Sequence, residues 1–145
     1  FNTFLAAQIN LNCNSLLMKG TKVSDLITIS GDVHHIFPRN YLKKNGIDNK
    51  TKYNQVANYI YLDTQVNKAI GDDPPSVYFA KVQEQCGTKA ITLGNISDEE
   101  MLYRNLEENS IPQNIVSMDI SDYESFLQER RKLMAKLMQR YYQEL

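Results

Sequence analysis

The sequence predicts an α+β domain that is mostly helical, with a small core of two short strands and one helix. Segments rich in β-branched and aromatic residues, at 27–36 and 59–62, predict the strands. Helix start signals made of proline and acidic residues recur beyond these segments. We expect one domain over 1–145, with a strand–strand–helix core at about 29–71 and flanking helices at about 1–19 and 75–145.

Length and composition restrict the class of protein. The 145 residues fit a single domain, and 42% hydrophobic with 23% charged residues are ordinary values for a folded domain. No apolar run approaches the roughly 20 residues of a membrane span, and no signal sequence is visible. Because the chain begins at Phe1, we expect a fragment of a longer protein or a processed product.

The two cysteines, Cys13 and Cys86, are far apart, and the sequence has no C-x-x-C pair. This pattern argues against a thiolate zinc knuckle and against a disulfide scaffold. We therefore expect two buried free thiols in a reducing cytoplasm.

The first third of the chain gives mixed signals. Residues 1–19 have apolar spacing typical of a helix, followed by alternation with asparagines, so we expect a helix and then irregular chain. Gly20 is an expected break, and residues 23–27 a short helical turn. The strand segment that follows is interrupted by Gly31, where a bulge or turn is expected.

Pro38 fits the first turn of a short helix over 39–45, which Gly46 would end in a left-handed conformation. The polar residues 48–54 are typical of a loop. After the second strand, Asp63 or Thr64 can cap a helix that Gly71 would end.

Three more helices are predicted by their start signals. Prolines after Asp73 indicate a helix over 76–85 that stops near Gly87. Capping boxes are expected at 97–100 and 121–124, and Pro112 should close the first of their two helices.

The longest helix, after 121–124, carries an apolar stripe that we expect to pack in the core. The stripe consists of Tyr123, Leu127, Met134, Met138, Tyr141 and Leu145. The basic residues of this helix are expected mostly on its solvent-exposed face: Arg130, Arg131, Lys132, Lys136 and Arg140.

The only two histidines of the chain, His34 and His35, are adjacent on the first predicted strand. A neutral imidazole suits a general base, because its pKa lies close to working pH. Neighbours on a strand point to opposite faces, so a bulge or turn near Gly31 would be needed for both rings to face one site. An asparagine oxygen on a following helix, such as that of Asn67, is a reasonable ligand for a hard cation.

Charge is unevenly distributed, although the net charge of −1 does not indicate a nucleic-acid-binding protein. The stretch 39–52, shortly after the histidines, contains Asp48 as its only acidic residue. It contains five basic residues: Arg39, Lys43, Lys44, Lys50 and Lys52. The stretch 98–124 is acidic overall. The basic stretch lies where a polyanion would dock if the histidines were catalytic.

The pattern DVHHIFP at 32–38, NYIYL at 58–62 and Asn67-Lys68 resembles the HNH (ββα-metal) endonucleases. The longer string from DVHHIFPRNYL to IGDDPPSVYF is similar to the C-terminal nuclease domain of GmrSD-type restriction proteins. The match covers about residues 29–80. In that family a ParB-like domain precedes the nuclease domain, so the resemblance implies a missing N-terminal part.

The resemblance implies a role for each matching residue. His35 matches the general base that activates water, and Asn58 the residue whose side chain holds the loop behind that base. His34 and Asn67 match the two metal ligands, and Asp32 would orient a histidine or take part through water. Mg²⁺ is the expected metal, with Mn²⁺ or another divalent transition metal accepted, and cleavage would leave 5′-phosphate ends.

Two features depart from the family pattern. His34 stands where aspartate is frequent, so a softer transition metal or help from Asp32 is expected. The zinc-binding cysteines of many HNH proteins are missing, so flanking helices must supply the scaffold. Arg39, Lys43, Lys44 and Lys68 are the expected phosphate contacts.

The leading hypothesis is a metal-dependent DNA endonuclease domain of a cytoplasmic prokaryotic defence protein. The alternatives are a catalytically inactive HNH-like module that binds nucleic acid or a partner, and a ribonuclease or toxin on the same scaffold. Asn40 and Asn54 are interpreted as loop caps, and Asp72 and Asp73 as helix caps, with a metal role as the minor alternative. The target sequence and the oligomeric state stay open.

Overall fold

The computed structural model describes residues 1–28 and 31–145. Over this part of the chain the fold is α+β and mostly helical, with eight α-helices around one sheet of two antiparallel strands. The elements up to the sheet's second strand are α1 (Asn2–Asn10), α2 (Val23–Thr28), β1 (Gly31–His35), α3 (Arg39–Lys44), α4 (Lys50–Tyr53), η1 (Val56–Asn58) and β2 (Tyr59–Asp63). Those that follow are α5 (Thr64–Ile70), α6 (Pro75–Thr88), α7 (Glu99–Glu108), η2 (Gln113–Ser117), η3 (Ile120–Asp122) and α8 (Tyr123–Gln143).

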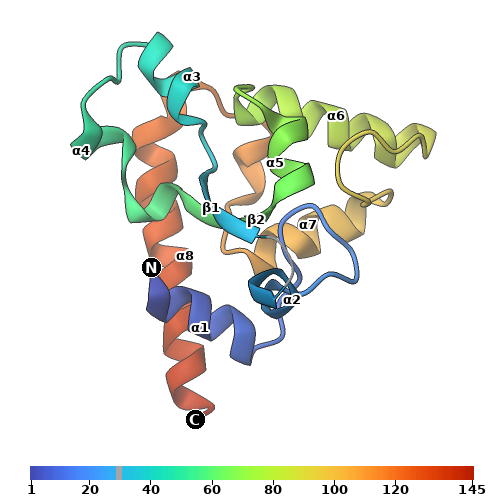
Figure 1. Ribbon diagram of the computed structural model, residues 1–145, viewed down its shortest axis with the longest axis vertical. Helices are drawn as coiled ribbons and strands as arrows, with labels where there is room; N and C mark the ends of the chain where they lie inside the picture. Colours follow the sequence, from blue (N-terminus) through green and yellow to red (C-terminus); the bar gives the residue numbers. More distant parts are fainter. Residues whose placement is uncertain (29–30) are drawn as a thin grey trace.

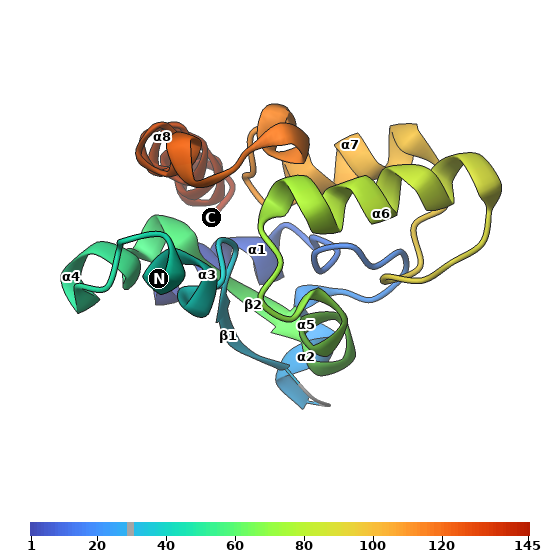
Figure 2. The same cartoon turned by 90° about the horizontal axis from the view of Figure 1, so that it is seen from above.

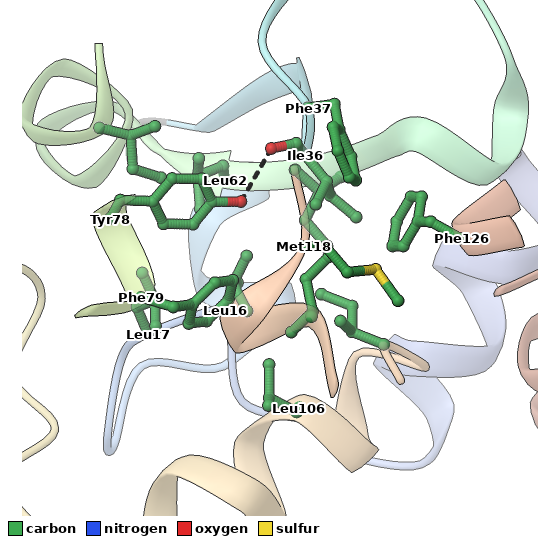
Figure 3. Close-up of a cluster of buried hydrophobic side chains, with 14 of the residues drawn as sticks. Leu16, Leu17, Ile36, Phe37, Leu62, Tyr78, Phe79, Leu106, Met118 and Phe126 are labelled. Carbon is green, nitrogen blue, oxygen red and sulfur yellow. Dashed lines mark hydrogen bonds between the residues drawn. The ribbon is translucent and has the colours of Figure 1, made fainter. Parts of the chain in front are cut away.

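In Figure 1 the sheet lies between α3, α4 and α8 on one side and α6 and α7 on the other, and Figure 2 shows it below α6, α7 and α8, beside α2 and α5. Helix α1 packs against α8, and η1 contacts α8 as well. Figure 3 shows the buried cluster between these layers, which joins the chain after β1 to α6 and α8 through Ile36, Phe37, Tyr78 and Phe126. The core therefore sits directly behind the histidine-bearing strand.

The two strands pair without interruption from Gly31 opposite Asp63 to His35 opposite Tyr59. The bulge expected near Gly31 is therefore not present in the paired segment; Ile29 of the predicted strand lies outside the described residues. A Cβ atom at Gly31 would lie 2.7 Å from the Tyr61 ring and 2.8 Å from the Leu26 Cβ atom. Glycine is required here because α2 and β2 approach closely.

The unit β2–α5 forms as the sequence predicts. Asp63 caps α5, since its Oδ1 accepts hydrogen bonds from the backbone N–H groups of Gln65 (2.9 Å) and Val66 (3.1 Å). Gly71 follows the last turn with φ +58°, a conformation that favours glycine. These local signals place Asn67 on a short helix that returns alongside the sheet.

Helix boundaries agree with the predictions in part. Residues 50–53 form α4 rather than loop, because the Asn49 side chain accepts from the Thr51 backbone N–H at 2.9 Å and starts a turn. Helix α6 runs from Pro75 to Thr88, so it ends near Gly87 as predicted, and its C-cap Lys89 has φ +65°. Helix α3 agrees with the prediction, and Gly46 beyond it has φ +90°.

The two expected capping boxes are wrong in detail. Helix α7 is capped by Asp98, which accepts from the Met101 backbone N–H, and not by Ser97. Before α8, the capping box is formed by Asp119 and Asp122 on η3.

The apolar stripe of α8 is buried at Tyr123, Leu127 and Met134, but Leu145 is 77% exposed. Arg130, expected on the solvent-exposed face, is instead 0% exposed. Its position three residues after Leu127 and four before Met134 puts it on the buried face of the helix. The expectation of an exposed Arg130 is therefore wrong.

Both cysteines are free thiols; Cys13 is buried and Cys86 only half-buried, which corrects the expectation for the second. Burial raises the pKa of Cys13 to about 11. In the described part of the chain, no helix has the length and hydropathy needed to cross a membrane.

Candidate active site

The chain leaving β1 is held by a set of buried hydrogen bonds that we call the clamp, made by Ile36, Phe37, Asn58 and Tyr78. The Asn58 side chain is 0% exposed; its Oδ1 accepts from the Phe37 N–H (2.8 Å) and its Nδ2 donates to the Phe37 carbonyl (3.0 Å). The Ile36 N–H donates to the Asn58 carbonyl (2.8 Å), and the Tyr78 hydroxyl donates to the Ile36 carbonyl (2.8 Å; Figure 3). Every backbone polar group of Ile36 and Phe37 thus has a partner, which fixes the path immediately after His35.

Arg130 supports the clamp from α8. Its Nη1 donates to the carbonyls of Ala57 (3.0 Å) and Tyr59, the two neighbours of Asn58, and its Nη2 donates to the Asn109 carbonyl (3.3 Å). No carboxylate pairs with Arg130 in the described part of the chain. Burial therefore lowers the pKa of its guanidinium to about 9. The long helix is thereby connected to the backbone on both sides of Asn58.

A cavity of about 380 Å³ opens beside the clamp. It is formed by β1, the start of α3 and the last turn of α5, and its lining consists of Asp32, Val33, His34, His35, Pro38, Arg39, Asn40, Asn67, Ile70, Gly71 and Asp72. The structure therefore brings together at one cavity five of the residues singled out from sequence: Asp32, His34, His35, Arg39 and Asn67.

The strand register determines how the two histidines are presented. His34 pairs with Ile60 and Asp32 with Leu62, so the side chains of Asp32 and His34 lie on the same face of the ladder. His35 belongs to the opposite face, yet it also lines the cavity, because it is the last residue of β1 and the pairing ends there. The paired residues contain no bulge, so the register places the two rings on opposite faces of the strand, and the approach of both rings to one site stays a prediction.

The His35 ring is fixed by three neighbours. It makes a T-shaped contact with Tyr59 (centroids 5.4 Å apart) and a tilted contact with Tyr53 (6.5 Å). Its Nε2 lies 3.0 Å from Oδ1 of Asn54. These contacts give one ring nitrogen a partner and place the ring between defined neighbours.

Both histidines have lowered pKa values. Burial lowers the pKa of His34, and the negative charge of Asp32 opposes this shift. Burial also lowers the pKa of His35; the Asn54 hydrogen bond opposes it, and the charges of Arg39 and His34 add to it. Both imidazoles are thus neutral at pH 7, the form in which a histidine accepts a proton or binds a metal.

The polar groups around the cavity differ from those of the clamp in having few partners. The Asn67 side chain is half-buried and has no hydrogen-bond partner among the described residues. No group of three or more His, Cys, Asp or Glu in that part of the chain could hold a metal. A cation at the cavity would therefore have the Asn67 amide oxygen and the His34 imidazole with at most one carboxylate of the described residues, a donor set that leaves positions for water and phosphate.

The other predicted residues lie outside the cavity lining. Asn58 is behind it, in the clamp, where its side chain makes the loop-holding bonds described above. Lys43, Lys44 and Lys68 are exposed and do not line the cavity; the Lys43 ammonium lies over the Tyr53 ring, 5.3 Å from its centroid. Their contact with nucleic acid stays a prediction.

Sequence reasoning missed or misassigned several residues. Asp72 and Asp73 do not cap α6, whose N-cap is Pro74; Asp72 lines the cavity and Asp73 pairs with Lys81 at 3.0 Å. Asn54 is the C-cap residue of α4 through its backbone N–H, and its side chain in addition contacts His35. The burial of Arg130 could have been predicted from its spacing to Leu127 and Met134. The contact between Asn54 and His35 had no signal in the sequence.

No family model, curated protein or solved structure matches the chain. The chain is therefore assigned to no family by comparison. The arrangement of the cavity and the clamp carries the functional argument.

Proposed function

We propose that this chain is a metal-dependent endonuclease domain of the HNH (ββα-metal) type that hydrolyses DNA phosphodiester bonds. The observation that carries the proposal is the cavity lined by His34, His35 and Asn67, with Asn58 clamping the backbone directly behind His35. This combination provides a fixed base beside possible cation ligands, the two requirements for metal-assisted hydrolysis of a phosphodiester. Its setting would be cytoplasmic prokaryotic defence, with an N-terminal ParB-like part choosing the target.

His35 is proposed as the general base. Its neutral ring takes a proton from water, the water oxygen forms a bond to phosphorus, and the bond from phosphorus to the 3′ oxygen breaks. The clamp supports this role because it fixes the two residues that follow His35. Contacts with Tyr53 and Tyr59 restrict the ring itself.

His34 and Asn67 are the proposed metal ligands, with Asp32 on the same strand face as His34. Asp72 also lines the cavity. When bound, Mg²⁺, Mn²⁺ or another divalent ion would stabilise negative charge on the phosphate and on the leaving oxygen. The chain's own contribution is to hold these donors on two elements, β1 and α5, that pack together.

A substrate phosphate would meet positive charge beside the cavity. Arg39 lines the cavity, and Lys43, Lys44, Lys50 and Lys52 are exposed on α3 and α4. The ion pairs found among the described residues involve none of these five side chains. They are therefore available to phosphates, as is Lys68 on α5.

The test is nicking of supercoiled plasmid by the full chain with Mg²⁺ or Mn²⁺, beside an EDTA control and His35→Ala. We expect cleavage that requires the cation and falls by about 10²-fold or more in His35→Ala, the usual contribution of a general base. The thermal unfolding midpoint of His35→Ala shows whether it is folded. Parallel single-stranded RNA and DNA substrates separate a ribonuclease from a deoxyribonuclease.

A folded wild type that binds DNA and fails to cleave it with any divalent cation would favour the non-catalytic HNH-like module. Metal titration then decides between the two. Under the nuclease proposal, Mn²⁺ raises the thermal midpoint of the wild type and has little effect on Asn67→Ala. Equal responses of the two proteins would exclude Asn67 as a ligand.

A further inference from the structure

Asn54 reaches His35 from a separate segment of the chain. It is the residue that follows α4, 19 positions after His35, and its Oδ1 lies 3.0 Å from His35 Nε2. Its backbone N–H already donates to the Lys50 carbonyl at 2.9 Å, so the end of α4 does not use the side-chain amide. The preceding residue, Tyr53, is buried and anchors this segment. The Asn54 side chain is thus placed for His35 alone among the described residues.

This contact has a consequence for the protonation pattern of the ring. A neutral imidazole carries one N–H donor and one lone-pair acceptor on its two nitrogens. An amide oxygen can only accept, so Oδ1 of Asn54 pairs with His35 when the hydrogen is on Nε2. Nδ1 then carries the lone pair, and it has no hydrogen-bond partner among the described residues.

We propose that Asn54 is a positioning residue that selects the Nε2–H tautomer of His35 and leaves Nδ1 as the nitrogen that receives a proton. In the hydrolysis proposed above, that proton comes from the attacking water as its oxygen bonds to phosphorus and the 3′ oxygen departs. The catalytic part rests on the proposed function. The tautomer part is independent of it, since it concerns only the resting protein.

The ring contacts make this selection specific. The contacts with Tyr59 and Tyr53 restrict the plane of the His35 ring. Within that plane, a 180° flip about the Cβ–Cγ bond would put Cε1 in the place of Nε2 and lose the bond to Asn54. The clamp fixes the backbone just beyond the ring. Asn54 therefore acts on a ring whose orientation is already restricted.

The first test is a long-range ¹H–¹⁵N correlation spectrum of the full chain labelled at histidine, recorded above pH 7. The chain has only two histidines, so His34→Gln assigns the signals. We expect the Nε2–H tautomer for His35 in the wild type and in Asn54→Asp, which retains an acceptor oxygen. In Asn54→Ala the two nitrogens should approach the averaged shifts of an unselected ring.

Asn45→Ala is the matched control, because Asn45 is likewise a helix C-cap residue, that of α3, and its amide bonds only to the Tyr41 carbonyl, at 2.8 Å, among the described residues. It should leave the His35 signals unchanged. An Nδ1–H tautomer in the wild type, or an unchanged Nε2–H tautomer in Asn54→Ala, would overturn the inference. The wild-type spectrum alone can do so, even where a variant fails to fold.

The second test is steady-state cleavage. We expect Asn54→Ala to lower kcat by about 10-fold or more with KM unchanged, a part of the total general-base contribution. If His35 has the Nε2–H tautomer but the protein never cleaves DNA, the nuclease proposal is rejected and the role of Asn54 in selecting the tautomer is retained. Cleavage that needs His35 but is unaffected in Asn54→Ala would reject the positioning role and keep the nuclease.

Discussion

Asn58 and Asn67 lie on the elements before and after β2, yet their side chains have opposite surroundings. In the clamp, Asn58 is fully buried and its amide is bonded on both sides to Phe37. At the cavity, Asn67 is half-buried and its amide has no partner among the described residues. The same side chain thus stabilises the backbone in one place and is left available for a ligand in the other.

The comparison teaches how burial separates the two roles. A buried amide must be satisfied within the protein, because an unpaired polar group in the interior is costly. A half-exposed amide can bond to water, so the fold does not require a partner for it. Stability should therefore depend on the clamp, and ligand binding on the cavity. The following variants test that division, ordered by expected effect.

Arg130→Ala should have the largest effect on stability. It removes the donor to three backbone carbonyls and leaves a cavity, so we expect the free energy of unfolding to fall by about 4 kcal/mol. Urea denaturation measures this value. Arg131→Ala is the control, since Arg131 is exposed and should contribute less than about 0.5 kcal/mol. Equal losses in both variants would contradict a supporting role for Arg130.

Asn58→Ala should lower the free energy of unfolding by about 2–4 kcal/mol, because it leaves the Phe37 N–H and carbonyl unpaired in the interior. Asn67→Ala should change it by less than about 0.5 kcal/mol. Urea denaturation of the pair, without divalent cation, gives the comparison directly. A large loss in Asn67→Ala would mean that the fold, and not a ligand, requires that side chain.

Tyr78→Phe should cost about 1 kcal/mol, since only the hydrogen bond to the Ile36 carbonyl is lost and the ring stays packed. Thermal or urea unfolding detects a difference of this size. Tyr142→Phe, at an exposed position of α8, should be neutral. A neutral Tyr78→Phe would show that the clamp holds without the hydroxyl.

The smallest effect is a dependence of stability on pH from the two histidines. Their pKa values are lowered in the folded state, so below about pH 6.5 the unfolded chain binds protons that the native rings resist. The free energy of unfolding should therefore fall as the pH drops below this value. Unfolding at pH 7.5 and 5.5 should show a smaller difference in a His34→Gln, His35→Gln double variant. An identical difference would assign the pH dependence to other groups.

Local sequence signals predicted the strand–helix unit well. The N-cap at Asp63, helix α5 and its C-terminal Gly71 could all be predicted, because each depends on residues within one turn. The segment 50–53 was not predicted as a helix, since one short polar turn has no hydrophobic periodicity and was given only by the Asn49 cap.

Long-range contacts were beyond the sequence for a physical reason. The unbroken register of β1 and β2 depends on the packing of Gly31 against α2 and β2, which no local pattern encodes. The expectation that a basic residue is solvated failed for Arg130, because backbone carbonyls around Asn58 supply its acceptors. The sequence pattern singled out His34, His35 and Asn67, which line the same cavity in the structure. Their catalytic roles stay predictions.

The guanidinium of Arg130 also sets an order of events during protein synthesis. Every residue that lines the cavity leaves the ribosome at least 58 residues before Arg130 does, as the difference between positions 130 and 72 shows. Until then the carbonyls on both sides of Asn58 have no such donor, and the backbone behind His35 is held less firmly. A nascent chain that ended before α8 would carry the full set of candidate side chains without their final support. We therefore expect the site to mature only as the last helix docks.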